Sequence, residues 1–289
     1  MRDIITNLRR IPTLFYLLST FICVVFILLS TSYFADDPAN NQSMLVYMLK
    51  GDHSLSGLVM WHNVLSSSDM NTWLLILAPL ICTVPYVYTF CIDVNTRCYI
   101  FSLNRQGLYR FLISRFLGAG IYSAMVMFSA MILSFFIAVM YSTNLGSYSD
   151  APIAEMLVHR QSAALAFIEV CLTYIFYAFL IGIICITLAS SISNAFTSCS
   201  TLVLVLFLMG DVQSSYRSRF FKKMFSGEVS RYEYNHYTDF LFVGNVAHGM
   251  PEFQNDFHMP YIIYMIAYIA VIILFYLVFH NIMKKKVIL

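Results

Sequence analysis

The chain has 289 residues, of which 60% are hydrophobic, 16% are aromatic and only 11% are charged. A soluble domain carries charged residues at roughly a quarter of its positions. So little charge, combined with several long apolar runs, excludes an ordinary soluble protein and predicts an integral membrane protein. The formal net charge of +2 is small, and nothing in the sequence indicates a nucleic-acid partner.

The length of the apolar runs predicts a bundle of six membrane-spanning helices, because a hydrocarbon core of about 30 Å needs about twenty residues of helix. The expected spans are 13–34, 72–92, 116–141, 162–189, 195–210 and 260–283. The first span is too long for the apolar part of a signal peptide, and we expect it to be retained. The fifth is the shortest, and the sequence SSISN before it predicts a tight hairpin between the fourth and fifth spans.

Two longer segments, 35–71 and 211–259, separate spans on the side opposite the termini. Both mix aromatic or apolar residues with charges, which is typical of segments at the headgroup level of a bilayer. We expect short re-entrant or interfacial helices there. The whole chain, 1–289, is then a single all-α transmembrane domain.

The distribution of lysine and arginine predicts that both termini are cytoplasmic, since cytoplasmic loops are enriched in basic residues. The basic residues that support this orientation are Arg2, Arg9, Arg10, Arg97, Arg105, Arg110, Arg115, Lys284, Lys285 and Lys286. The basic cluster at 217–223 falls on the other side and opposes the prediction. Long loops cross a membrane largely regardless of charge, so the orientation still stands.

The sequence contains none of the common catalytic motifs. It lacks the phosphate-binding loop of ATPases, the His-Glu-x-x-His motif of zinc proteases and the Gly-x-Ser-x-Gly turn of hydrolases. The seven cysteines lie within or at the edges of apolar spans, which indicates neither a disulfide framework nor a metal site.

Two features inside the expected spans have more than one interpretation. Glu169 is either a polar site on a substrate path or subunit interface, or a carboxyl that is hydrogen-bonded to a neighbouring helix near the membrane boundary. Pro79 and Pro85 are either hinges or simply tolerated in a membrane helix, and the second interpretation is favoured.

The segment 93–115, between the second and third spans, is amphipathic. We expect a helix over its first part, a turn at the sequence LNRQG, and a second helix that presents basic residues to the cytoplasm and continues into the third span. An ordinary positively charged loop with aromatic anchors is an equally good interpretation of these residues alone.

This layout resembles the permease subunit of type-2 ABC exporters over essentially the whole chain. Asp93, the turn SLNRQG, Arg105, Tyr109 and Arg115 match the acidic residue, turn and basic-aromatic pattern of that family's elbow. The longer segment between the first two spans and the basic cluster at 217–223 depart from the family pattern.

The resemblance implies that the elbow is a coupling helix, which docks onto a separate P-loop ATPase that binds ATP and magnesium. The residues implied to contact the ATPase are Asp93, Arg97, Asn104, Arg105, Gln106, Gly107 and Tyr109. It further implies a second copy or a related permease, no cofactor on this chain, and a place in the plasma membrane of a bacterium.

The aromatic content of the spans indicates an amphipathic substrate such as a peptide, lipid or drug-like molecule, with Glu169, Tyr174 and Tyr177 along its path. Two other classes remain open. One is a receptor or sensor that works without an ATPase, and the other is an intramembrane enzyme that uses Glu169, Asp69 or the outer histidines.

Overall fold

The computed structural model describes residues 2–30, 43–50, 61, 64–65, 72–141, 163–208 and 261–288, and these form helices and no β-strand. The expected all-helical class is therefore confirmed for this part of the chain. Residues 211–259, with the basic cluster at 217–223, lie outside the described residues. The segment 35–71 is described only at residue 43, in the short helix α3 (Met44–Lys50) and at residues 61, 64 and 65.

Among the described residues, four helices are long and apolar enough to cross a membrane: α5 (Thr72–Asn95), α7 (Leu108–Tyr141), α9 (Ala163–Ile192) and α14 (Tyr261–Ile288). α2 (Thr13–Leu29) and the helix Ala195–Leu208 are apolar but shorter. The 17 residues of α2 give about 26 Å of helix at 1.5 Å per residue, which is slightly less than a hydrocarbon core. The six-span bundle thus stays a prediction.

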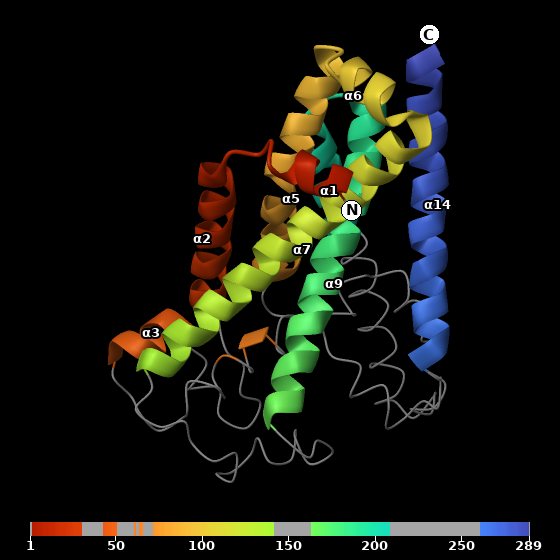
Figure 1. Cartoon of the computed structure of the whole chain (residues 1–289). Helices are drawn as coiled ribbons and strands as arrows, with labels where there is room; N and C mark the ends of the chain where they lie inside the picture. The colour runs from red at the N-terminus through yellow and green to blue at the C-terminus, as the bar shows by residue number, and fades with distance from the viewer. Residues whose placement is uncertain are drawn as a thin grey trace.

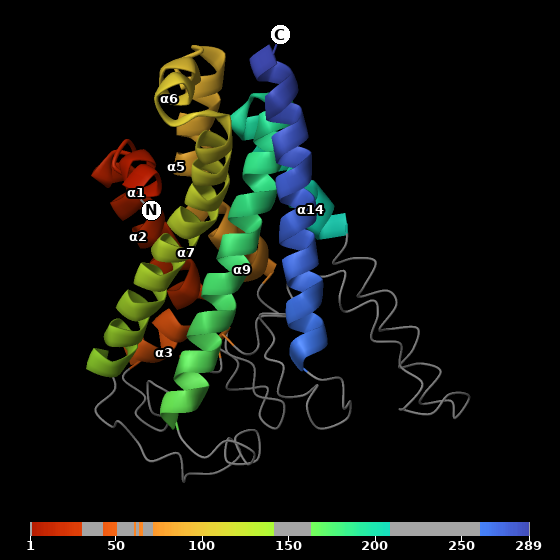
Figure 2. The same cartoon turned by 45° about the vertical axis from the view of Figure 1, so that its right-hand side comes forward.

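The long helices pack side by side around α7 (Figures 1 and 2). α7 contacts α2, α5, α9 and α14, and its most extensive contact is with α9. The short helix α1 (Arg2–Leu8) lies against α7, and α6 (Tyr99–Gln106) lies between the end of α5 and the start of α7. The start of α7 is therefore surrounded by several different elements.

Small residues allow α5, α7 and α9 to approach closely. An added Cβ at Gly120 of α7 would lie 2.6 Å from the ring of Phe179, and one at Gly182 of α9 would lie 2.8 Å from the carbonyl oxygen of Ala119. Both distances are shorter than van der Waals contact, so only glycine fits. Such small-residue contacts are typical of helix association inside membranes.

α2 does not separate buried apolar residues from exposed polar ones as a helix of a soluble protein does. Its buried face contains Ser19 and Thr20 beside the apolar Cys23, Val24 and Ile27, whereas Leu14, Leu17 and Phe21 are more than half exposed. Thr83 of α5 and Ser123 of α7 are also completely buried, and their hydroxyls are 2.9 Å apart. Polar contacts between helices and apolar outer surfaces are what a lipid environment favours.

α5 continues through both of its prolines. Pro79 and Pro85 each lack the N–H that a helix interior normally uses. The carbonyls that lose a donor are those of Leu75 and Ile81, four residues before each proline. The helix nevertheless reaches Asn95 without interruption, and membrane helices commonly accommodate proline in this way.

Candidate functional site

The elbow between α5 and α7 consists of α6 and two sharp turns. α5 ends at Asn95, and Arg97 has a φ of 57°, a left-handed conformation that suits the end of a helix. α6 then runs to Gln106, and Gly107 has φ 75° and ψ 157°, a region that only glycine adopts easily. α7 begins at the next residue. The chain thus turns sharply at each end of α6, and α7 runs back along α5.

The turn is shorter than the sequence indicated. Asn104, Arg105 and Gln106 belong to the last turn of α6 and are not part of a loop. Only Gly107 has the backbone conformation that ends the helix, and its N–H donates to the Leu103 carbonyl at 2.8 Å. Asn104 and Arg105 therefore have fixed positions on a helix surface.

An ion pair joins the two helices that the elbow connects. The Arg115 guanidinium of α7 donates to the Asp93 carboxylate of α5. The Arg115 side chain is 2% exposed and the Asp93 side chain is 19% exposed. The Phe111 ring lies one turn earlier in α7, 5.5 Å from the centre of the guanidinium, and adds a cation–π contact.

The expectation that Arg115 faces the cytoplasm is wrong. In α7 the residues at spacings of three and four from Arg115, namely Phe111, Leu112 and Ala119, are all buried. Arg115 belongs to this buried stripe, and the helical period places its side chain against α5 rather than in solvent. Arg110 lies on the other side of α7 and is exposed.

The N-terminal segment holds the elbow from a second direction. Arg10 donates to the Asp93 carboxylate at 3.4 Å and to the Ser102 hydroxyl of α6 at 3.2 Å. The Gln106 side-chain amide donates to the Asp3 carboxylate at 3.1 Å. Asn7 of α1 donates to the Ser114 hydroxyl of α7 at 3.1 Å.

The C-terminal helix and the turn after α9 approach the elbow from a third direction. The Tyr99 hydroxyl of α6 donates to the Lys286 carbonyl of α14 at 3.4 Å. Asn95 donates to the Ser193 carbonyl at 3.0 Å, and the Lys286 ammonium donates to the Ser193 hydroxyl. The elbow is thus linked by side-chain hydrogen bonds to α1, α14 and the turn that follows α9.

The outer face of the elbow is exposed. Of the residues expected to contact an ATPase, Arg97, Asn104, Arg105, Gly107 and Tyr109 are exposed, Tyr109 to 66%. Asp93 and Gln106 point inward and hold the elbow in place. The structure therefore divides the expected set into an exposed group and an anchoring group.

Phe101 is a prominent residue of this face that was not expected at the site. Its side chain is 80% exposed and lies at positions i, i+3 and i+4 with Asn104 and Arg105 on α6. That spacing is visible in the sequence and could have identified the face. The apolar side chain of Phe101 is thus flanked by the Arg105 cation and the Asn104 amide. We call these three residues, together with Arg97 and Tyr109, the elbow face.

No protein-family model matches the chain, and no curated protein or solved structure is similar enough to it to show a relationship.

The residues expected along a substrate path lie elsewhere, on α9. Tyr174 and Tyr177 are buried inside the chain, and the Tyr174 hydroxyl donates to the Leu65 carbonyl at 2.9 Å. Glu169 belongs to α9, and its side chain, like Asp69, lies outside the described part of the structure. Glu169, Tyr174 and Tyr177 are distant from the elbow face in sequence, and none of the described contacts joins them to it.

Within the described ranges, no group of three or more His, Cys, Asp and Glu side chains lies close enough together to hold a metal ion. Of the histidines, only His280 is described, and its ring lies 6.1 Å from that of Tyr276 on the same helix. Two pairs of cysteine sulfurs lie 3.5 Å apart, Cys23 with Cys82 and Cys185 with Cys199, all four being buried free thiols.

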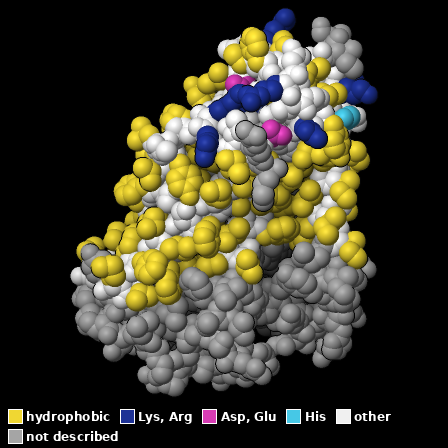
Figure 3. All heavy atoms as spheres, in the orientation of Figure 1, with side chains coloured by type: hydrophobic (Ala, Val, Ile, Leu, Met, Phe, Trp, Pro, Cys, Tyr) yellow, Lys and Arg dark blue, Asp and Glu magenta, His cyan; other side chains and the backbone are white. Residues whose placement is uncertain are grey.

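Charged side chains gather at the end of the molecule that carries the elbow. Figure 3 shows lysine, arginine and aspartate over the region of α1, α6 and the C-terminal end of α14, above a surface that is mostly hydrophobic. Arg9, Arg97, Arg105, Arg110 and Lys284 are all exposed. This end can therefore attract an acidic partner or an acidic surface.

Proposed function

We propose that the chain is the membrane-embedded permease subunit of an ATP-driven exporter, and that the elbow face binds a separate ATPase. The observation that carries the proposal is the position of α6. It is a short, exposed, amphipathic helix directly between two helices long enough to span a membrane, and a buried ion pair fixes its base. A helix placed in this way can convert a push from a partner into a displacement of both long helices.

The end with the elbow is cytoplasmic in this proposal, and both termini lie there. Its exposed arginines and lysines support that orientation, because basic residues concentrate on the cytoplasmic side of membrane proteins. In this proposal α2 and the helix Ala195–Leu208 complete the six spans.

The partner that fits the elbow face has an apolar groove with acidic groups at its rim. Phe101 is the apolar anchor, and an aromatic side chain in a groove is a common centre of binding energy. Arg97 and Arg105 provide the charges that attract and orient the partner. ATP and magnesium are bound by the ATPase, whose closure would move α6 and, through it, α5 and α7.

The substrate in this proposal is amphipathic and passes between two copies of the chain, or between this chain and a related permease. Tyr174 and Tyr177 are buried within one chain, so a path along α9 requires its helices to separate from their present packing. The displacement of α5 and α7 by the ATPase would separate them from α9, since α9 packs against both helices.

The test is purification of the tagged chain from its native membrane in a mild detergent, followed by mass spectrometry and an ATPase assay. We expect a P-loop ATPase in stoichiometric amount. Phe101→Glu and Arg105→Glu should each release it, whereas Lys284→Glu, which makes the same charge change as the latter at an exposed position of α14, should retain it.

All three variants should elute and unfold like the wild-type chain, because the substituted side chains are exposed. The proposal is refuted if the chain purifies with no ATPase. It is also refuted if Phe101→Glu retains the ATPase and the ATP hydrolysis measured with the wild-type chain.

A further inference from the structure

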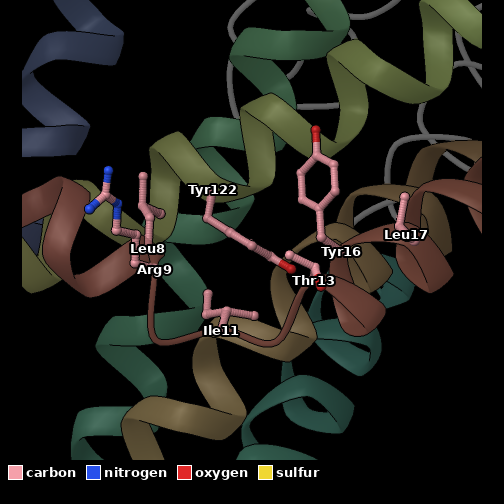
Figure 4. Close-up of a pocket in the computed structure, with 7 residues that line it drawn as sticks. All are labelled: Leu8, Arg9, Ile11, Thr13, Tyr16, Leu17 and Tyr122. Atoms are coloured by element: carbon pink, nitrogen blue, oxygen red, sulfur yellow. The ribbon is translucent and has the colours of Figure 1, made fainter.

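A groove of about 500 Å³ lies where the link between α1 and α2 crosses α7 (Figure 4). Leu8 and Arg9 lie at one end of it and Tyr16 and Leu17 at the other, with Tyr122 of α7 between them. Apart from Arg9, Thr13 and the two tyrosine hydroxyls, its lining is hydrocarbon. A ligand for this groove therefore has a long apolar part.

The same groove contains a hydroxyl without a partner. Tyr122 is 4% exposed, and its hydroxyl, which points toward Thr13 at the start of α2, has no hydrogen-bond partner among the described residues. Tyr16 differs, because its hydroxyl bonds to Ser129 and to the Met125 carbonyl. A buried hydroxyl without a partner is costly, which indicates that a polar ligand atom belongs beside it.

The groove also has the electrostatics of an anion site. The 17-residue helix α2 begins here after Pro12, and no side chain caps its first N–H groups. Its N-terminus carries a partial positive charge. Arg9 is exposed and forms no ion pair with a described residue, whereas the adjacent Arg10 is held by Asp93 and Ser102.

We propose that this groove binds one anionic phospholipid. The phosphate lies at the start of α2 between Arg9 and the Thr13 and Tyr122 hydroxyls, and one acyl chain lies along Tyr16 and Leu17. Beyond the groove, the outward face of α2 continues with the exposed residues Leu14, Leu18 and Phe21, which extend the apolar surface away from the charged end.

A lipid fits these observations better than a free phosphate. A free anion would bind at the helix start but would leave the hydrocarbon lining of the groove in contact with water, which is unfavourable in proportion to its area. The groove also connects the exposed Arg9 with the exposed apolar residues of α2, an arrangement that suits the level of a phospholipid headgroup.

The test is native mass spectrometry of the detergent-solubilised full chain, titrated with dioleoyl phosphatidylglycerol, with dioleoyl phosphatidylcholine or with glycerol 3-phosphate. We expect phosphatidylglycerol to bind at one site. Phosphatidylcholine has the same acyl chains without the net charge and should bind at least about tenfold more weakly, as expected for the loss of a strong charge-assisted contact. Glycerol 3-phosphate should not bind measurably.

Two variants locate the site. Arg9→Gln should weaken phosphatidylglycerol binding about tenfold, whereas Arg110→Gln, which removes the same charge from another exposed position at the same end, should leave it unchanged. Tyr122→Phe removes only the hydroxyl that lacks a partner and should weaken the same binding while the protein keeps its elution profile and its unfolding temperature.

Equal binding of the two phospholipids would refute the proposal, as would equal effects of Arg9→Gln and Arg110→Gln. Binding of glycerol 3-phosphate as tight as that of the phospholipid would show a free-phosphate site instead, and unchanged binding by Tyr122→Phe would show that the lipid lies outside the groove. None of these outcomes depends on an ATPase, so the lipid site is tested independently of the proposed function.

Discussion

The ion pair between Asp93 and Arg115 should make Asp93→Asn strongly destabilising. The substitution removes the charge of the carboxylate but leaves the guanidinium, whose side chain is 2% exposed, in the same buried position. The Arg115 Nε atom already has no hydrogen-bond partner in the described part of the chain, so it offers no replacement contact. Breaking a buried pair in this way costs about 3–5 kcal/mol, a large share of a typical stability of about 5–15 kcal/mol.

Arg10 provides the matched comparison because it contacts the same carboxylate oxygen. Its side chain is 46% exposed, so Arg10→Gln loses a largely solvated ion pair, which contributes about 0–1 kcal/mol. The double variant Asp93→Asn with Arg115→Met removes the unpaired charge and should recover most of the loss. The measurement is unfolding of the chain in mixed micelles with increasing dodecyl sulfate, monitored by circular dichroism.

The free energy of unfolding should be highest for the wild type, lower for Arg10→Gln, lower again for the double variant, and lowest for Asp93→Asn. If Asp93→Asn costs no more than Arg10→Gln, the carboxylate does not hold a buried charge and the elbow is not fixed by this pair. If the double variant is less stable than Asp93→Asn alone, the cost comes from lost packing of the Arg115 side chain rather than from its charge.

Three further substitutions test the backbone and the packing, each by the same unfolding measurement. Gly182→Ala places a Cβ 2.8 Å from the Ala119 carbonyl oxygen and should lower the free energy of unfolding by about 1–3 kcal/mol. An equal loss in Gly182→Ser would show that the neighbouring atoms cannot move aside for a Cβ. Gly107→Ala meets no neighbouring atom, so its cost of about 1–3 kcal/mol would come from the backbone conformation alone, and an unchanged stability would mean that the turn differs from the one described. Arg97→Gly should instead stabilise the chain by up to about 1 kcal/mol because it relieves a left-handed residue, whereas Arg97→Ala should not, and equal effects of the two would contradict this explanation.

Much of the helical framework could be predicted from the sequence because apolar length alone requires it. The ranges expected for the second and third spans, 72–92 and 116–141, fall inside α5 and α7. The helix ends could not be located as well, since a helix in a membrane protein can continue into polar surroundings. α7 starts at Leu108 because the single glycine before it can make the turn, and nothing in the composition of LNRQG distinguishes one turn residue from several.

The direction of individual charged side chains was harder to predict than the helices. Arg115 follows Arg110 by five residues, and a count of positive charges treats the two as equivalent. They differ only because the helical period places Arg115 on the stripe that packs against α5, where Asp93 is available as a partner. The role of α1 was missed for a similar reason, since hydrogen bonds such as that from Asn7 to Ser114 join residues that are distant in sequence and leave no local pattern.

The anchoring of α6 determines what a force on the elbow face can do. Tyr99, Ser102 and Gln106 lie at spacings of three and four on the inner face of α6, and each bonds to a different neighbour: α14, the segment after α1, and α1 itself. α6 is therefore not free to roll on its own when Phe101 is pushed, because rolling would break all three bonds together. A force on Phe101 would therefore displace α6 together with its neighbours. The ion pair between Asp93 and Arg115 requires the ends of α5 and α7 to move together. A partner that pulls on this face would thus shift the end of the bundle that carries the elbow as one unit, and the opposite ends of α5, α7 and α9 would change their separation.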